Sequence, residues 1–201
     1  TSFREFRRQM GSQLLSPDVR ISNRSISLVF TDLSGSTAMY EAVGDAEAFR
    51  IVNEHFRILR EVVESHGGVI VKTIGDAIMA SFHTTGSAFD AALAMREAFE
   101  RWMDASSPDE GGSLTRPRLN IGVHTGPALV VHSEAHGFDY FGRTVNIAAR
   151  AQGAAKEGAL VVTEPVYAYP SVREALADAA VESFEANLKG LGQVRLYRLP
   201  L

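Results

Sequence analysis

The chain has 201 residues, 45% of them hydrophobic, so it can bury the core of one globular domain. Its net charge of −4 leaves no basic excess to follow a nucleic-acid backbone, which disfavours nucleic-acid binding. The absence of cysteine excludes disulfides, thiolate metal sites and a cysteine nucleophile, and suits a reducing compartment, so we expect a cytoplasmic location. No apolar run approaches the roughly 20 residues that a membrane span requires.

The first 24 residues differ from the rest of the chain. Apolar side chains recur there at helical spacing among arginines; they are Phe3, Phe6 and Met10. The pair Ser16-Pro17 then interrupts the pattern. We interpret residues 1–24 as a helical connector from an upstream regulatory domain of a longer protein, and residues 25–201 as the folded catalytic domain.

From Ser25 onward the pattern predicts strands and helices in mixed order. The expected strands cover about residues 25–33, 69–74, 77–82, 119–125, 128–132, 160–163, 181–188 and 194–199. The expected helices begin at Ser36 or Thr37 and cover about 45–66, 86–104, 144–155 and 171–179, with a polar loop at 105–116. This order contains the split βαβ arrangement of an α+β, ferredoxin-like core (βαββαβ-type) with extra strands and helices.

Two local patterns give the clearest predictions of secondary structure. The helix at 45–66 carries apolar residues at steps of three and four, which form one stripe: Phe49, Val52, Phe56, Leu59 and Val63. The strands at 69–74 and 77–82 are joined by Gly75-Asp76, a pair typical of a type II′ hairpin turn.

Asp32 stands at the end of the first expected strand. Gly35 then allows a sharp turn, and Ser36 or Thr37 can start a helix. Backbone N–H groups at such a helix start suit a phosphate, and a neighbouring carboxylate suits Mg²⁺. The alternative is that Asp32 only caps the helix.

Asp76 lies at the tight turn of the hairpin, where aspartate is common for purely local reasons. As a pair, however, Asp32 and Asp76 could share two divalent cations, because two-metal sites hold their ions roughly 3.5–4 Å apart. The pair therefore points to phosphoryl chemistry on a nucleotide.

Lys72 belongs to the strand before that turn. Strict alternation places it on the same face as Ile70 and Ile74. A lysine between apolar neighbours either extends to water at a sheet edge or faces an interface or ligand, and the pattern leaves both open.

Asn146 and Arg150 are four residues apart on an expected helix and so share a face. Arg150 could spread its donors over phosphate oxygens, and Asn146 could bind a sugar. The alternative is an ordinary solvated helix face.

The six histidines form no recognisable metal-ligand pattern. We place His55 and His66 on the long helix, and His132 and His136 in a loop, as ordinary core or surface residues.

Four motifs in order resemble the class III adenylyl/guanylyl cyclase catalytic domain, over about residues 25–201. They are Phe30-Thr31-Asp32-Leu33-Ser34-Gly35-Ser36-Thr37, Val71-Lys72-Thr73-Ile74-Gly75-Asp76, Gly122-Val123-His124-Thr125-Gly126 and Phe141-Gly142-Arg143-Thr144-Val145-Asn146-Ile147-Ala148-Ala149-Arg150. One stretch departs from the usual glycine-containing form of that family, namely Val130-Val131-His132-Ser133-Glu134-Ala135-His136-Gly137. We expect it to reshape the hairpin after Pro127, and with it dimer packing or nucleotide entry.

The resemblance implies a class III nucleotidyl cyclase fold and a role for each matching residue. Asp32, Asp76 and the Leu33 carbonyl would bind two divalent cations, Mg²⁺ or Mn²⁺, while Gly35, Ser36, Thr37 and Lys189 would bind phosphate. Lys72 and Asp139 would read the base, Asn146 would orient the ribose, and Arg150 would stabilise the transition state. The alignment of Lys189 is the loosest of these.

The implied activity is conversion of ATP to 3′,5′-cyclic AMP and pyrophosphate in a head-to-tail homodimer. Lys72 donates and Asp139 accepts, which suits N1 and the amino group of adenine and mismatches guanine. The alternatives are a guanylate cyclase, a non-catalytic regulatory module that binds nucleotide, and another two-metal nucleotidyl transferase.

Overall fold

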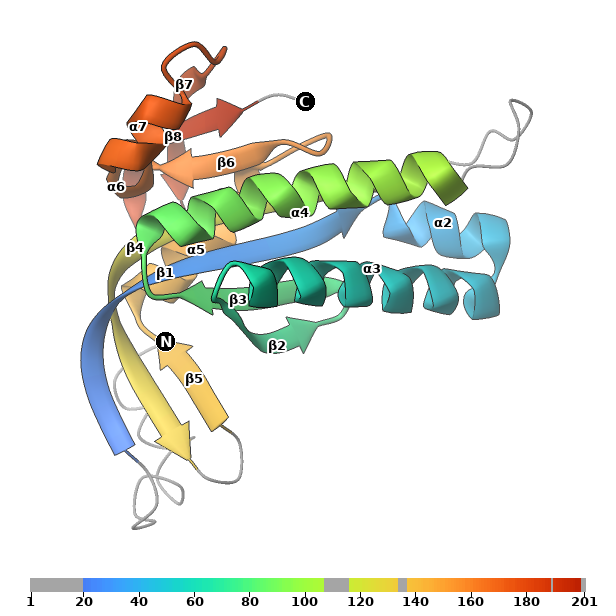
Figure 1. The fold of residues 1–201 in the computed structure, drawn as a ribbon, viewed down its shortest axis with the longest axis horizontal. Coiled ribbons are helices and arrows are strands. Elements are labelled where there is room, and N and C mark those ends of the chain that lie inside the picture. The colour runs from blue at the N-terminus through green and yellow to red at the C-terminus, as the bar shows by residue number, and fades with distance from the viewer. Residues whose placement is uncertain (1–19, 107–115, 134–136, 189, 200–201) are drawn as a thin grey trace.

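The computed structural model describes residues 20–106, 116–133, 137–188 and 190–199 as one eight-stranded sheet with helices on both faces (Figure 1). The strands are β1 (Arg20–Ser34), β2 (Val69–Ile74), β3 (Ala77–Phe82), β4 (Arg118–Ser133), β5 (Gly137–Phe141), β6 (Leu160–Thr163), β7 (Glu182–Leu188) and β8 (Gly192–Leu199). The helices are α2 (Ser36–Val43), α3 (Asp45–Ser65), α4 (Thr85–Ser106), α5 (Arg143–Ala154), α6 (Glu164–Tyr167) and α7 (Pro170–Ala175). None of these described helices has both the length and the hydropathy of a membrane span.

The strands lie in the order β2-β3-β1-β4-β6-β8-β7, and β5 pairs with the second half of β4. Only the β4–β6 pair is parallel; the other neighbours are antiparallel. Helices and antiparallel strands thus share one sheet, which confirms the expected α+β class.

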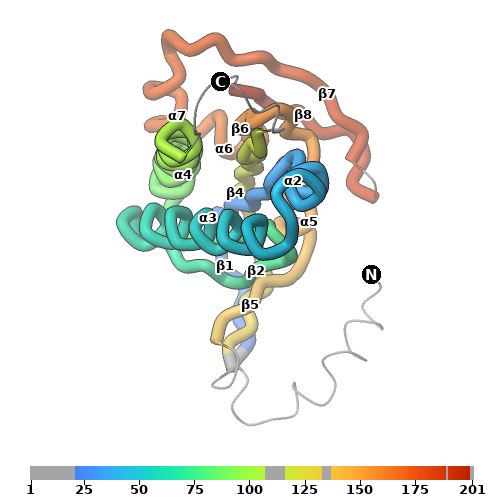
Figure 2. Tube along the Cα trace, turned by 90° about the vertical axis from the view of Figure 1, so that its right-hand side faces the viewer, coloured from blue at the N-terminus to red at the C-terminus, as the bar shows by residue number. Residues whose placement is uncertain are grey.

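The two faces of the sheet bury different side chains. Helices α3 and α4 lie side by side over one face, with Leu59 and Phe99 in a core that also contains Val29. Helix α5 covers part of the other face, where Leu28 and Tyr140 pack in a second cluster. Figure 2 shows α4 and α5 on opposite sides of β4.

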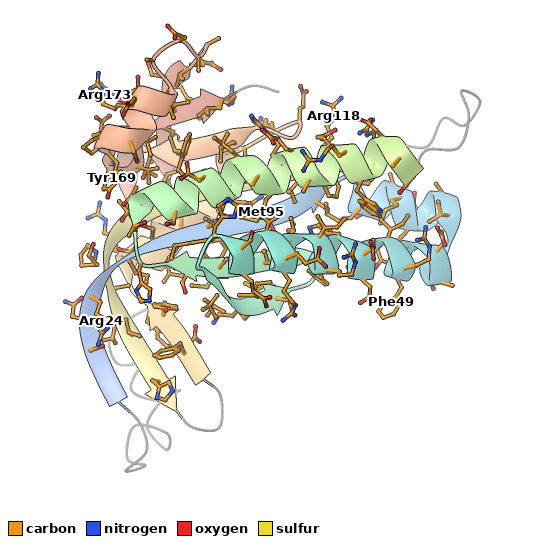
Figure 3. All side chains as sticks on the ribbon, in the orientation of Figure 1. Arg24, Phe49, Met95, Arg118, Tyr169 and Arg173 are labelled. Carbon is orange, nitrogen blue, oxygen red and sulfur yellow. The ribbon has the colours of Figure 1, made fainter. Side chains whose placement is uncertain are left out.

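The stripe expected on α3 holds for most of its length. Val52, Leu59 and Val63 are buried and Phe56 is partly buried against the core, but Phe49 is 64% exposed. Figure 3 shows Phe49 near the end of α3 that extends past β2 and β3, so no strand lies beneath it to receive the ring.

Strands β1 and β4 pair over their whole length and bend together away from the helices (Figure 1). Strand β1 begins at Arg20, five residues before the expected start at Ser25, because its first residues pair with Leu129–His132 of β4. The rest of the expected connector, residues 1–19, lies outside the described residues.

Strand β4 is continuous, and the expectation of two strands, 119–125 and 128–132, was wrong. Pro127 lies inside β4 opposite Ser25. Proline has no backbone N–H, so a strand tolerates it on a side where no neighbouring strand would accept a hydrogen bond. The pairing of β4 with β6 ends at Val123 and its pairing with β5 begins at Leu129, so on that side Pro127 needs no donor.

Further details differ from expectation, among them an unpredicted helix α6 (Glu164–Tyr167) and the end of α7 at Ala175. His132 lies in β4, and its ring centre is 4.5 Å from that of Phe138, at an interplanar angle of 44°. Phe138 belongs to β5, a strand that we had not predicted. Helix α4 extends to Ser106, two residues past its expected end. His136 and most of the expected 105–116 loop lie outside the described residues.

Candidate active site

Asp32 and Asp76 come together at one end of β1. The pairing of β1 with β3 runs to Thr31 opposite Ile78, so the next residue of β1 lies beside the turn that precedes β3. That turn has φ 64° at Gly75, whereas Asp76 has no positive φ, as a type II′ turn requires. The turn geometry therefore places the second carboxylate next to the first.

The surroundings of the two carboxylates favour a bound cation. Burial raises the pKa of Asp32, and the negative charge of the adjacent Asp76 raises it further. Hydrogen bonds from the Leu33 backbone amide and Gln152 act in the opposite direction. The Oδ2 atom of Asp76 is buried and accepts no hydrogen bond from any described residue. Two crowded carboxylates with an unpaired oxygen are suited to hold a divalent cation.

The site needs further oxygen ligands to complete such coordination. The described residues contain no cluster of three or more His, Asp or Glu side chains around a common point. Mg²⁺ typically binds one or two carboxylates and takes its other ligands from water and phosphate. A two-carboxylate site that also receives a phosphate oxygen fits this chemistry.

The start of α2 lies directly after this strand end. Gly35 adopts φ 82°, a left-handed conformation, and no side chain caps the helix. The contacts of the Asp32 carboxyl are with Leu33, Gln152 and Asp76, so the alternative of Asp32 as a helix cap is not supported. The first amides of α2 are thus available to an anion.

Lys72 and Asp139 form the second pair. The Nζ atom of Lys72 lies 2.7 Å from the Asp139 carboxylate and 6.0 Å from the centre of the Phe141 ring. The lysine and aspartate side chains are 41% and 36% exposed, so solvent or a ligand can reach both. The sequence had not predicted that these two side chains would touch within one chain.

The face expected for Lys72 was partly wrong. A bulge interrupts the pairing between Ile70, which is opposite Ala80, and Lys72, which is opposite Met79. Successive residues of β3 point to opposite faces, so Lys72 lies on the face opposite to Ile70. The bulge turns Lys72 toward the face that carries α5.

Asn146 and Arg150 lie on the exposed side of α5, as their spacing predicts. Within the described part of the chain, neither side chain has a hydrogen bond or ion pair. Both groups are therefore open to a ligand or a second chain.

Helix α5 is seated by close contacts with β4. The Thr144 hydroxyl donates to the Pro127 carbonyl at 2.6 Å. A Cβ atom on Gly122 would lie 2.1 Å from the backbone nitrogen of Gln152, so only glycine fits beneath the helix there. His124 lies on β4 near the same helix, with Nδ1 2.7 Å from the Thr163 hydroxyl.

Gln152 is the site residue that sequence reasoning missed. It follows Ala148, a buried residue of α5, by four positions and therefore shares the sheet-facing side. A polar side chain at the end of that buried stripe was the available indication. Lys189, expected to bind phosphate, lies outside the described residues.

The comparisons with known proteins agree with this geometry. The family model described as "Adenylate and Guanylate cyclase catalytic domain" matches residues 20–200. An adenylate cyclase of Anabaena cylindrica is 33% identical over 153 residues, which cover 72% of this chain and 30% of that protein. The structure of adenylate cyclases from Trypanosoma brucei in their monomeric state has a TM-score of 0.70 and 25% identity, covering 87% of this chain and 89% of the other.

A second solved structure, an adenylate/guanylate cyclase/hydrolase from Silicibacter pomeroyi, shares the fold with a TM-score of 0.73 at 21% identity. It covers 90% of this chain and 99% of the other. The fold and the paired acidic groups define a nucleotide-cyclase type of domain. The chain belongs to the adenylate and guanylate cyclase catalytic domain family.

Proposed function

We propose that this chain is the catalytic domain of an adenylate cyclase, which converts ATP to 3′,5′-cyclic AMP and pyrophosphate. The observation that carries the proposal is the Asp32–Asp76 pair with its unpaired, buried Asp76 oxygen. Such a pair suits a metal-bound triphosphate. The 33% identity to an adenylate cyclase supports the same assignment.

The choice of ATP rests on Lys72 and Asp139. An ammonium group has three donors and a carboxylate about four acceptor positions, so the pair can contact each other and still read a base. Lys72 would donate to N1 of adenine and Asp139 would accept from its amino group. Guanine presents the opposite pattern, and one mismatched buried polar group costs about 1–3 kcal/mol.

Two divalent cations, held by Asp32, Asp76 and the Leu33 carbonyl, would supply charge neutralisation and a lower pKa for the ribose 3′-hydroxyl. The amides of Gly35, Ser36 and Thr37, with Lys189, would hold the β- and γ-phosphates.

Asn146 would orient the ribose so that its 3′-oxygen attacks the α-phosphorus in line. A new O–P bond forms as the bond to pyrophosphate breaks, and water or substrate takes the 3′-proton. Arg150 would offset the charge that develops on the α-phosphate; arginines in this role contribute ~10³–10⁵ in rate.

The site would be shared between two protomers in a head-to-tail homodimer. One protomer would supply Asp32 and Asp76, and the other would supply Lys72, Asp139, Asn146 and Arg150. The exposure of Lys72 and Asp139, and the lack of described partners for Asn146 and Arg150, support this arrangement.

The domain would also act within a longer signalling protein. The chain spans 30% of the length of its Anabaena cylindrica relative, and a Trypanosoma congolense relative is named a receptor-type adenylate cyclase. We therefore also propose that a regulatory domain precedes this part of the protein, and that this part lies in the cytoplasm.

The test is a product assay with ATP and GTP in parallel, in Mg²⁺ and in Mn²⁺. We expect cyclic AMP, with kcat/KM for ATP about tenfold to a hundredfold above that for GTP. Asp76→Asn should abolish the product, whereas the exposed carboxylate variant Asp90→Asn should not.

Each other outcome of the assay would indicate a different function for the domain. A preference for GTP would make the domain a guanylate cyclase. Nucleotide binding without turnover in either metal would indicate a regulatory module. Products that join two nucleotides would indicate a different two-metal transferase.

A further inference from the structure

A cavity lies away from the Asp32–Asp76 pair, on the bent part of the sheet. It is an open groove of about 590 Å³ between the first residues of β1 and β2 and strand β5. Its volume falls within the ~300–1,000 Å³ of pockets that bind small organic molecules. None of the residues proposed above for nucleotide or metal lines it.

The floor of the groove is apolar. Ile26, Val130 and Tyr140 are buried there, and Phe138, 53% exposed, lies at its edge. The Tyr140 hydroxyl accepts a hydrogen bond from Ser81 at 3.1 Å. The groove thus offers an apolar bed for an aliphatic or aromatic group.

The polar side chains around this floor are basic groups and hydroxyl groups. Arg24, His83 and His132 line the groove, and no described Asp or Glu side chain does. Arg24 is opposite Ala128 in the β1–β4 register, and Ala128 packs in the same cluster as Ile26. Arg24 therefore lies on the groove face of β1; Figure 3 shows it on the bent part of that strand.

Arg24 is also a cation without a counter-ion in the described part of the chain. The nine ion pairs found there do not include it, in a protein whose net charge is −4. A guanidinium group beside an apolar floor is suited to a carboxylate attached to an apolar body. A single permanent positive charge matches a monoanion better than a triphosphate.

We propose that this groove is a binding site for a medium-chain monocarboxylate, with the chain on Ile26 and Val130 and the carboxylate on Arg24. The histidines would add hydrogen bonds to the same carboxylate. Residues 1–19 of the same chain carry Arg4, Arg7 and Arg8 against Glu5 and Asp18, so their net positive charge does not complement this groove.

The experiment uses decanoate as the probe, with decanol and decylamine as neutral and cationic probes of the same length. Calorimetry on the full 201-residue chain measures affinity, and backbone amide NMR shifts locate the site. We expect saturable decanoate binding below about 1 mM, at least tenfold tighter than either other probe, with shifts centred on Arg24, Val130 and Tyr140.

Two variants and a control sharpen the result. Arg24→Gln should weaken decanoate binding about tenfold or more and leave decanol unchanged. Ser22→Trp, at an exposed position that lines the groove, should block decanoate; if it fails to fold, Arg24→Gln still decides. Arg101→Gln, an exposed arginine of α4 paired with Glu97, should bind like the unaltered chain.

The proposal is overturned by any of four results. These are no saturable binding, equal affinity for decylamine, an unchanged affinity in Arg24→Gln, or NMR shifts that centre elsewhere. A groove already filled by the chain's own residues 1–19 would give the first of these.

Discussion

The ionised form of Asp32 destabilises the fold, because the carboxylate is partly buried and lies beside Asp76. Its folded pKa is raised, so the protonated form is favoured, and the fold loses stability as pH rises through that raised value. Asp32→Asn removes this charge. We expect it to raise the free energy of unfolding at neutral pH without metal.

The same variant should lose its response to metal. For the unaltered chain, Mn²⁺ at a hundred times its dissociation constant should stabilise the fold by about 2.7 kcal/mol. Thermal melts in chelator and in Mn²⁺ measure both effects, with Asp90→Asn as the control. An equal Mn²⁺ response in Asp32→Asn would exclude this carboxylate as a metal ligand.

His55 is buried in α3 against Phe56 and Phe99, and neither ring nitrogen has a hydrogen-bond partner among the described residues. Burial lowers its pKa to about 4, and the charge of Asp76 opposes this shift. A depressed pKa means that stability present above about pH 6.5 is lost as pH falls toward 4. The loss from this residue is about 3 kcal/mol.

We therefore expect His55→Leu to flatten the dependence of unfolding free energy on pH between 4 and 6.5. Urea unfolding across that range measures the difference between the variant and the unaltered chain. His124, whose pKa burial also lowers to about 4, should keep part of the slope in the variant. Parallel curves for the two proteins would contradict the assignment.

At the scale of elements, the seating of α5 on β4 is the critical contact. Gly122→Ala places a methyl group against the backbone of Gln152, so the helix must shift. We expect a loss of about 1–3 kcal/mol in stability and a large fall in kcat, because Asn146 and Arg150 move with the helix.

A matched control lies on α5 itself. A Cβ on Gly153 meets no atom within 4 Å, so Gly153→Ala should stabilise the helix by about 0.5–1 kcal/mol and keep activity. Denaturant unfolding and the cyclic AMP assay compare the two variants. If Gly122→Ala behaved like Gly153→Ala, the close contact would not position the helix.

At the scale of the whole molecule, the proposed dimer predicts that two inactive variants regain activity when they are mixed. Asp32→Ala and Lys72→Ala should each be inactive, but their mixture should recover up to about a quarter of the activity, because half of the dimers formed at random are mixed and have one intact site. Specific activity should also fall on dilution. Mixed dimers that form, as native mass spectrometry would show, yet make no cyclic AMP would refute the shared site.

The sequence by itself determined the local pieces of this protein. Periodicity located the long helices, and Gly75-Asp76 predicted the hairpin because a tight turn is fixed by its own residues. The motifs around Asp32, Lys72 and Asn146 indicated the family, which the family model confirms.

Only the tertiary structure decided how these pieces meet. The bulge in β2 reverses the face of Lys72 relative to Ile70, and the gap between the β6 and β5 pairings of β4 lets Pro127 lie inside a continuous strand. Contact of Asp32 with Asp76, and of Lys72 with Asp139, joins residues 44 and 67 positions apart. Register, bulges and long-range pairing depend on which neighbour a strand finds, and no local pattern encodes that choice.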